Sequence, residues 1–382
     1  MSRRRPLRLV SIAHSYGVAL NRRLAHEMGR AGAGRWEVTA VAPSFIHGDL
    51  RPVPLEPADG ECCHVEPVPA YLTRNLHLLS YGTRLRQVLR QGWDLVHCWE
   101  EPFNVSAAQV AWWTPAGTPL VFYTFQNIDK RYPPPFSAFE RYCVRRASGW
   151  LAAGTSVART LVPRGYDRRP YQVVPLGVDT DYFGPNASAG RSVREMLGWT
   201  ADGAPVVGYL GRFVPEKGID LLTGALDKLH AGWRALFVGS GPMREHLERW
   251  AARHGDRVRI VTGVRHAEVP AYLCAMDLLT APSQTTPAWR EQLGRMLIEA
   301  FASGVPVLAS DSGEIPFVVA DAGRVVGERD EAGWVSALED LLASPRARAE
   351  MARQGLERAH SVYAWPVIAR QHLEFFEQRL AA

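Results

Sequence analysis

Short apolar segments rich in β-branched residues alternate along this chain with longer stretches of helical periodicity. Six occur in each half: 7–13, 36–43, 94–99, 119–125, 149–154 and 171–176, then 205–211, 234–239, 257–263, 277–283, 305–310 and 323–327. Such runs are typical of strands buried on both faces, and strands that alternate with helices form βαβ units around a parallel sheet. The pattern therefore predicts an α/β protein with two Rossmann-like domains, each built on a six-stranded parallel sheet.

The length of 382 residues also fits two domains of roughly 100–200 residues each. A segment rich in turn-forming residues, 175–186, separates the two sets of strands, so we expect domains at 1–175 and 176–364. An amphipathic helix over 365–382, entered at Pro366, is expected to pack back toward the first domain. Ligands are expected in a deep cleft between the domains, where the carboxyl ends of parallel strands converge.

Composition excludes several other classes of protein. With 47% hydrophobic and 22% charged residues, the chain is not predominantly disordered. Its apolar runs are well short of the roughly 18 residues that cross a bilayer, and the N-terminus lacks the pattern of a signal peptide. The five cysteines are odd in number and form no CxxC pair, which argues against disulfides and zinc. We expect a cytoplasmic protein.

Charge is distributed unevenly between the two halves. Residues 1–175 carry 22 Lys and Arg against 13 Asp and Glu, whereas residues 176–382 carry 22 against 26. A basic half suggests an anionic partner, such as the inner face of a membrane, although Arg-rich composition alone is the alternative. The segment 76–90 fits either a basic amphipathic helix that faces a membrane or an ordinary surface helix. Arginines interleaved with aromatics on a recognisable module are missing, so no nucleic acid partner is expected.

Two stretches of the second half carry the candidate chemistry. After the run 205–211, which ends at Gly211, the cations Arg212 and Lys217 share one loop and would suit a diphosphate. Further on, Glu291 and Glu299 are eight residues apart and flank Gly294, which we place at the start of a helix. Solvated loop charges are the alternative for each residue taken alone. Together they form a candidate site for a diphosphate and a sugar.

These stretches resemble the retaining glycosyltransferases of family 4, which have the GT-B fold. The matching segments are PLGVDTDYF (175–183), GRFVPEKG (211–218), VGSGP (238–242), TGVRHAEVPAYL (262–273) and EQLGRMLIEAFASGVPVLASDSGEIP (291–316). The resemblance implies a hexosyltransferase for polysaccharide, glycolipid or small-metabolite assembly. It implies that the second domain binds a nucleotide-diphosphate sugar and the first domain a hydroxyl acceptor.

The resemblance also implies roles for individual residues on the donor side. Arg212, Lys217 and Glu291 would be catalytic: the two cations would neutralise the leaving diphosphate, and the glutamate would hold sugar hydroxyls. Glu299 would bind the ribose and Val264 would flank the base. The remaining donor-binding residues would be Gly211, Gly239, Gln292, Leu293, Gly294 and Leu297. Transfer would retain the anomeric configuration by front-face attack, with no metal and no other cofactor.

On the acceptor side this sequence departs from the family pattern. The stretch 123–128 carries Gln126 and Asn127 in place of a histidine found in many relatives, so that histidine's role does not transfer. Other candidates on this side are His14, Gly17, His97 and Glu101. Each histidine has a hydrogen-bonded structural role as its alternative.

One acidic pattern would favour a metal site, and two other functions are alternatives to a glycosyltransferase. Asp179-Thr180-Asp181 spells a DxD, a metal-binding signature elsewhere, but it lies in the expected linker, where we favour a structural role. A GT-B-like nucleotide-sugar epimerase and a non-catalytic nucleotide-sugar-binding protein at the membrane surface are the alternative functions. The sequence does not reveal the base, the sugar, the acceptor, the linkage or the oligomeric state.

Overall fold

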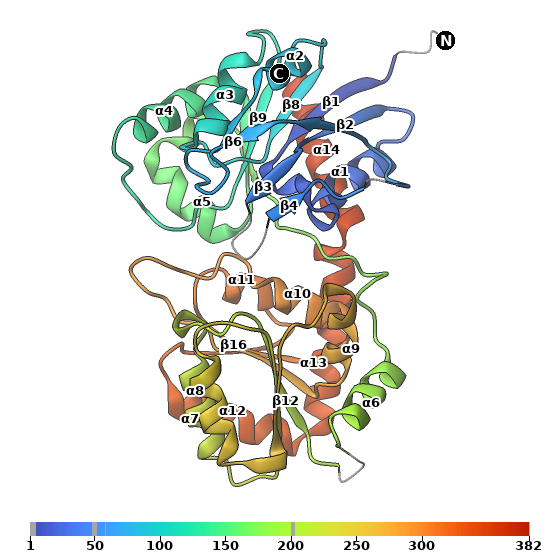
Figure 1. Ribbon diagram of the computed structural model, residues 1–382, viewed down its shortest axis with the longest axis vertical. Coiled ribbons are helices and arrows are strands. Elements are labelled where there is room, and N and C mark those ends of the chain that lie inside the picture. Colours follow the sequence, from blue (N-terminus) through green and yellow to red (C-terminus); the bar gives the residue numbers. More distant parts are fainter. Residues whose placement is uncertain (1–4, 48–51, 58, 200–202, 382) are drawn as a thin grey trace. The chain divides into compact units, whose positions relative to one another are not determined.

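The chain divides into two compact units in the computed structural model, which describes residues 5–47, 52–57, 59–199 and 203–381 (Figure 1). Unit 1 comprises Met1–Leu176 and Trp365–Ala382, and unit 2 comprises Gly177–Ala364. Each unit is built on one parallel sheet with helices packed on it, which confirms the predicted fold class.

In the described residues, the sheet of unit 1 has seven parallel strands in the order β11-β10-β9-β8-β1-β2-β5. These strands are β1 (Leu7–Ile12), β2 (Trp36–Pro43), β5 (His64–Val68), β8 (Leu95–Cys98), β9 (Leu120–Thr124), β10 (Gly149–Ala152) and β11 (Tyr171–Val173). Two short antiparallel hairpins lie outside the sheet: β3 (Phe45–His47) with β4 (Pro52–Pro54), and β6 (Ala70–Tyr71) with β7 (Ser80–Tyr81).

The sequence predicted six strands for this sheet, and the seventh strand, β5, was not predicted. β5 pairs with β2 alone at the edge of the sheet, most of its residues are at least partly exposed, and it contains Pro67. Proline cannot donate a ladder hydrogen bond and is confined largely to edge strands. An exposed edge strand does not need a continuous apolar run, so the pattern that indicates a buried strand is missing here. The prediction of six strands is therefore wrong for unit 1.

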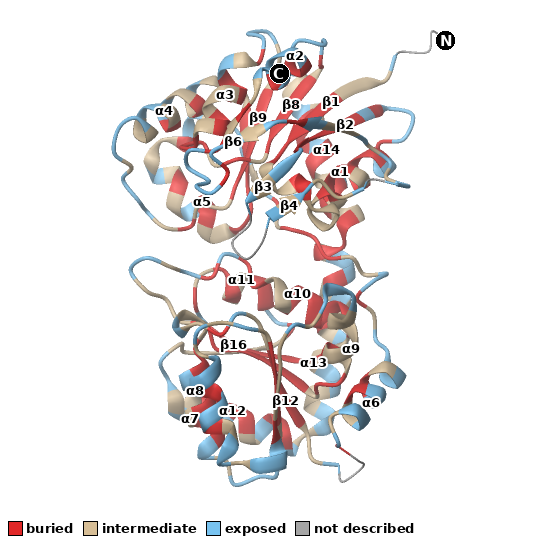
Figure 2. Ribbon diagram, viewed as in Figure 1, coloured by how far each residue is buried: buried red, intermediate tan, exposed pale blue. Residues whose placement is uncertain are grey.

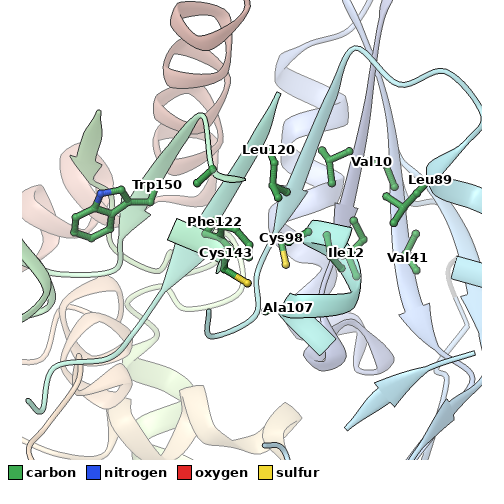
Figure 3. Close-up of a cluster of buried hydrophobic side chains, with 14 of the residues drawn as sticks. Val10, Ile12, Val41, Leu89, Cys98, Ala107, Leu120, Phe122, Cys143 and Trp150 are labelled. Carbon is green, nitrogen blue, oxygen red and sulfur yellow. The ribbon is translucent and has the colours of Figure 1, made fainter. Parts of the chain in front are cut away.

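Side chains alternate between the two faces of this sheet, and different helices cover each face. Val10, Cys98 and Phe122 belong to one buried cluster with residues of α2, α3 and α4 (Figure 3). On the opposite face, α14 contacts the ring of Tyr123 and packs against α1. The helices and turns of unit 1 are η1 (His14–Gly17), α1 (Ala19–Ala31), α2 (Thr83–Leu89), α3 (Val105–Trp113), α4 (Phe136–Arg146), α5 (Thr155–Leu161), η2 (Val162–Arg164), η3 (Tyr166–Arg168) and α14 (Trp365–Ala381).

The segment 76–90, considered above as one amphipathic helix, is helical only in its second part. α2 covers Thr83–Leu89, and the residues before it form turns and the short strand β7. Leu76 and Leu78 are exposed in those turns. None of the helices in the described ranges is both long and apolar enough to span a membrane.

Unit 2 contains a six-stranded parallel sheet over the described residues, in the order β14-β13-β12-β15-β16-β17. Its strands are β12 (Val206–Leu210), β13 (Arg234–Val238), β14 (Val258–Val261), β15 (Leu278–Ala281), β16 (Val307–Ser310) and β17 (Arg324–Val326). Its helices and turns are α6 (Ala187–Met196), η4 (Pro215–Lys217), α7 (Ile219–Asp227), α8 (Arg244–Ala252), η5 (Gly255–Arg257), η6 (His266–Glu268), α9 (Val269–Cys274), α10 (Arg295–Ala302), α11 (Ile315–Val319), α12 (Glu331–Ala343), α13 (Pro345–Arg358) and η7 (Ala359–Tyr363). Figure 2 shows the central strands of this sheet largely buried and the outward faces of the helices exposed.

The strand order reverses beside the first strand of each sheet. In unit 1 the chain proceeds from β1 to β2 on one side and later to β8 on the other, and in unit 2 β12 lies between β13 and β15 in the same way. Loops that follow the two strands at such a reversal diverge to opposite faces and leave a crevice at the carboxyl edge. The candidate residues of each unit should therefore follow β1 and β8, or β12 and β15.

Candidate functional site

Lys217 and Glu291 meet at the strand reversal of unit 2. Lys217 ends η4 in the loop after β12, and its Nζ donates a hydrogen bond to Oε2 of Glu291 in the loop after β15. Ser283 Oγ donates to the same oxygen over 3.0 Å. The two charged side chains are only 13% and 9% exposed, so they form a largely buried ion pair rather than two solvated charges.

Two glycines bring these loops together. A Cβ on Gly218 would lie 1.8 Å from the carbonyl oxygen of Pro282, and the residue has φ +71°. A Cβ on Gly313, which follows β16, would lie 2.1 Å from the carbonyl oxygen of Glu291, which accepts the N–H of Glu314 over 2.9 Å. Only glycine permits backbone contacts this close, and the position of the Glu291 loop depends on them.

Two further glycines join the ends of β12 and β13. The position of a Cβ on Gly239 is 1.8 Å from the carbonyl oxygen of Gly211, so the two strand ends touch through their backbones. The side chain of Arg212, which follows Gly211, is 65% exposed, and its only described ionic neighbour is the Glu216 carboxylate at 4.0 Å. The guanidinium is therefore accessible beside a closely packed backbone.

The segment between Glu291 and Glu299 forms the start of α10, as predicted. Gly294 caps this helix with φ +74°, and Gln292 is exposed in the loop before it. Leu293 and Leu297 are buried, and Leu297 Cδ1 would lie 2.8 Å from a Cβ on Gly294. Their side chains therefore pack beneath the turn and support it, whereas its backbone remains the part that can face a ligand.

Glu299 lies in the second turn of α10 and is 8% exposed. Burial raises the pKa of its carboxyl to about 7, against the smaller opposing effect of Arg295 one turn earlier. A carboxyl of this pKa changes its ionisation near neutral pH, so its ability to accept hydrogen bonds from hydroxyl groups depends on pH.

Two aromatic side chains near Glu299 were not predicted. Tyr182 stacks on His266 with ring centroids 5.6 Å apart, and its hydroxyl donates to the His266 carbonyl over 3.1 Å. Burial, Asp179 and, to a smaller extent, Glu299 raise the pKa of Tyr182. Val264 is half-buried two residues before His266. Tyr182 directly follows the DxD pattern, and this position in the sequence is the feature from which it could have been predicted as a site residue.

Trp289 was likewise missed, although it precedes Glu291 by two residues. Its ring lies 5.0 Å from Lys217 Nζ, a cation–π contact on the ion pair. Within the DxD pattern, Asp179 Oδ1 accepts the backbone N–H groups of Asp181 and Tyr182, each over 3.1 Å, and so holds a turn. No cluster of three or more metal-ligating side chains occurs among the described residues.

The strand reversal of unit 1 places His14 beside Glu100. Glu100 follows β8, is 2% exposed, and accepts the backbone N–H of His14 over 2.6 Å and its Nδ1–H over 2.8 Å. Tyr81 and Ser106 donate to the same carboxylate. Burial lowers the pKa of His14, but the charge and hydrogen bond of Glu100 outweigh it and raise this pKa above its usual value. The imidazolium form is therefore stabilised at this edge.

Glu101 forms a second carboxyl at the same edge. It accepts the Phe125 N–H over 2.8 Å and the Thr124 hydroxyl, which link it to the end of β9. Burial raises its pKa to about 7, against the opposing effect of those two hydrogen bonds. Nearby, Gln126 Nε2 donates to the Ile128 carbonyl over 2.6 Å, and Asn127 is buried.

His97 was expected on the acceptor side, but its side chain is not at this edge of the sheet. In β8 its two sequence neighbours point to the face of the sheet covered by α2, α3 and α4. The His97 ring therefore points to the other face, where it contacts His372 and Phe376 of α14. Its Nδ1 pairs with Ser11 Oγ over 2.8 Å. Burial, with a contribution from His372, holds its pKa well below the usual value, as befits a neutral core histidine. Gly17 lies in η1, where a Cβ would meet only ordinary contacts with Pro43.

Comparisons with known proteins match both units. The family model for Glycosyltransferase Family 4 matches residues 21–182, and that for Glycosyl transferases group 1 matches residues 204–344. Over 201 residues the chain is 38% identical to the GDP-mannose-dependent alpha-(1-6)-phosphatidylinositol monomannoside mannosyltransferase of Mycolicibacterium smegmatis, with 50% of this chain and 52% of the relative covered. It is 31% identical over 239 residues to the 2-deoxystreptamine glucosyltransferase of Streptomyces kanamyceticus, covering 61% and 57%. The chain thus spans about half the length of the curated relatives it matches.

Solved structures resemble the chain over nearly its whole length. Sucrose-phosphate synthase from Thermosynechococcus elongatus has a TM-score of 0.72 at 21% identity, covering 98% of this chain and 99% of that structure. Anabaena HepE in complex with UDP and glucose has a TM-score of 0.73 at 17% identity, covering 97% and 100%. At these identities the likeness is one of fold.

Proposed function

Because the chain belongs to glycosyltransferase family 4, we propose that it transfers a sugar from a nucleotide-diphosphate donor to a hydroxyl acceptor. The observation that carries the proposal is the Lys217–Glu291 ion pair at the strand reversal of unit 2, with the exposed Arg212 in the same loop. Strand reversals of this kind are the usual ligand sites of open α/β sheets. Two cations and a carboxylate there suit a diphosphate linked to a sugar.

We assign the donor-side roles as follows. Arg212 and Lys217 bind the diphosphate and stabilise the negative charge that develops on it as the glycosidic bond breaks. Glu291 and the backbone of the turn before α10 hold sugar hydroxyls. Glu299 accepts the ribose hydroxyls, and Val264 flanks the base.

We further propose a metal-independent mechanism that retains the anomeric configuration. Transfer retains the anomeric configuration by front-face attack, and the two cations take the part that a divalent metal plays in other transferases. Neither a metal nor another cofactor is required. Measuring turnover with EDTA and with added Mg²⁺ tests the metal, and the anomeric configuration of the product tests retention.

Unit 1 supplies the acceptor side in this proposal. Glu101 has a pKa of about 7, which suits proton exchange with an attacking hydroxyl near neutral pH. The neighbouring His14 donates hydrogen bonds from its imidazolium form. These two groups compensate for the histidine that the stretch 123–128 lacks.

The donor and acceptor are to be identified by experiment. GDP-mannose is the first donor to test, since several relatives are GDP-mannose-dependent mannosyltransferases, and UDP-glucose is the second, since HepE was crystallised with UDP and glucose. Phosphatidylinositol mannosides are the first acceptors by the same reasoning. We further propose a cytoplasmic location at the inner face of an anionic membrane, supported by five unpaired cysteines and the basic character of unit 1.

The decisive experiment is thermal unfolding with UDP, GDP, ADP and their sugar conjugates, with EDTA present, followed by an acceptor assay with the donor that binds. Stabilisation by one nucleotide family, lost in Lys217→Ala and kept in Lys228→Ala, supports the site. Conversion of the donor without any acceptor would favour an epimerase. Binding without turnover on any acceptor would favour the non-catalytic alternative.

A further inference from the structure

A cavity of about 570 Å³ lies in unit 1 between α4 and the turns η2 and η3, apart from the carboxyl-edge residues described above. Five guanidinium groups and one carboxylate are prominent among its described lining residues: Arg141, Arg145, Arg164, Arg168, Arg169 and Glu140. The cavity therefore carries a formal charge of +4 from six side chains. Nothing in the proposed transferase chemistry uses these residues.

The single carboxylate is already occupied. Arg164 Nη2 donates to both oxygens of Glu140 over 2.7 Å, and the Tyr166 hydroxyl donates to one of them over 3.0 Å. Glu140 is 9% exposed, so this is a built and largely buried network. It fixes the Arg164 guanidinium in the wall of the cavity.

A second guanidinium is fixed by backbone groups. Arg169 Nε donates to the Val144 carbonyl over 3.3 Å, and its Nη2 donates to the Arg145 carbonyl at the end of α4. The η3 turn is thereby attached to α4. The cavity therefore has two pre-oriented guanidinium groups, which lose little further side-chain freedom when an anion binds.

Three further arginines have no described counter-charge. Arg141, Arg145 and Arg168 are exposed, and within the described ranges none of them forms an ion pair with a carboxylate. Arg141 and Arg145 lie at i and i+4 of α4, where like charges destabilise a helix. Arg164, whose Nη2 is fixed by Glu140, has a second nitrogen without a hydrogen-bond acceptor among the described residues. This nitrogen, Nη1, lies 3.8 Å from Asp129 Oδ1.

We propose that this cavity binds a phosphate group carried by a larger ligand. Guanidinium groups match phosphate oxygens as planar bidentate donors, and a bound anion would relieve the mutual repulsion of the arginines. The volume exceeds what an isolated inorganic ion needs and lies in the range of small-ligand sites. The ligand is a phosphomonoester or phosphodiester, either soluble or in a lipid headgroup. The inference does not depend on the proposed transferase activity.

The test uses the full chain and two triple variants that remove the same charge from unit 1. Arg141→Gln, Arg145→Gln and Arg168→Gln change the cavity, while Arg74→Gln, Arg86→Gln and Arg90→Gln change other exposed arginines of the same unit. Inorganic pyrophosphate is titrated by calorimetry, and sedimentation is measured with phosphatidylcholine vesicles with and without phosphatidylglycerol. All proteins also carry Lys217→Ala, which should weaken any binding of pyrophosphate at the loop after β12 by at least about tenfold.

We expect pyrophosphate affinity to fall at least about tenfold in the cavity triple and to be unchanged in the control triple, because charge-assisted bonds are lost only in the first. If phosphatidylglycerol vesicles bind and this binding is lost only in the cavity triple, while pyrophosphate does not bind, the phosphate belongs to a lipid headgroup. Pyrophosphate binding without vesicle binding identifies a soluble phosphate ester. Equal behaviour of the two triples, loss only in the control, or no binding of either probe overturns the proposal.

Discussion

Lys217 and Glu291 form an ion pair across 74 positions of sequence, from the loops that follow the adjacent strands β12 and β15. Under the proposed function, a diphosphate bound at Lys217 would compete with Glu291 for the same ammonium group. Donor binding and the release of Glu291 toward sugar hydroxyls would therefore be coupled. The ion pair holds both side chains in place.

Lys217→Ala should weaken binding of the nucleotide-diphosphate donor by at least about tenfold, or ~1.4 kcal/mol, because a charge-assisted contact to phosphate is lost. Calorimetric titration with the donor measures this. Lys228→Ala is the matched control, since Lys228 is 60% exposed in the same unit and pairs with Glu331. Unchanged affinity in Lys217→Ala would remove Lys217 from the site.

Donor affinity should rise with pH through about 7, because ionisation of Glu299 converts its carboxyl into a pure hydrogen-bond acceptor for ribose hydroxyls. Glu299→Gln should weaken binding and flatten this dependence, while the exposed Glu357→Gln should keep it. Titration with the donor between pH 5.5 and 8.5 measures both. An unchanged pH profile in the Glu299→Gln variant would contradict the assigned role.

Glu299 should also make the stability of the fold depend on pH: the stability that it contributes should fall as the pH rises, whereas donor affinity should rise. Its folded pKa is raised above its unfolded value, so protonation favours folding, and its contribution is lost as pH rises from about 4.5 through 7. The difference in unfolding free energy between Glu299→Gln and wild type should therefore shift in favour of the variant as the pH rises. Denaturant unfolding at pH 5.5 and 8 measures the shift, and a constant difference would argue against a raised pKa.

Glu101→Gln should lower turnover by about 10²-fold, the usual size of a general acid–base contribution, without changing donor affinity, because the residue lies in unit 1. The pH dependence of turnover near 7 should disappear in the same variant. Glu37→Gln, an exposed position of β2, is the control. A fall in donor affinity with unchanged turnover would assign Glu101 to another role.

The buried histidine pair of unit 1 should make folding sensitive to acid. His97 and His372 have ring centroids 5.6 Å apart, neither Nε2 has a hydrogen-bond partner among the described residues, and burial lowers the pKa of His372 to about 4. In the unfolded chain His372 takes up a proton below about pH 6.5, whereas in the folded chain it does not until about 4. Stability should therefore fall as pH decreases through this window, by about 3 kcal/mol for His372 alone.

His372→Leu should remove most of that acid sensitivity, whereas the exposed His360→Leu should not. Denaturant unfolding at pH 7 and at pH 4.5 gives the comparison. The same pH dependence in both variants would show that the histidine pair does not govern acid unfolding.

Gly239→Ala should destabilise unit 2 by about 2–3 kcal/mol, because its Cβ would overlap the Gly211 carbonyl oxygen and force the ends of β12 and β13 apart. Gly232→Ala is the control, since a Cβ there meets nothing within 4 Å. Calorimetric unfolding of both variants measures the difference. Equal stability would mean that the strand ends separate at little cost.

The sequence by itself determined the two parallel sheets and the local form of the segment from Glu291 to Glu299. A strand occurs at each of the predicted apolar runs, and the central ones are buried, because a strand covered on both faces must be apolar along its length. The edge strands β11 and β17 are shorter and more exposed than predicted. The start of α10 after Gly294 and the position of Glu299 in its second turn were equally predictable, since helix capping and helical spacing involve only neighbouring residues. The edge strand β5 was missed because an exposed strand with a proline has no such run.

Only the tertiary structure decided which distant residues meet. The Lys217–Glu291 pair depends on β12 lying beside β15, and the burial of His97 depends on α14, which comes more than 260 positions later and covers that face of the sheet. The arginine cavity depends on the η3 turn attaching to α4. Periodicity and spacing describe a segment and its neighbours in sequence, whereas burial and pairing follow from which segments pack together, and that is a property of the whole unit.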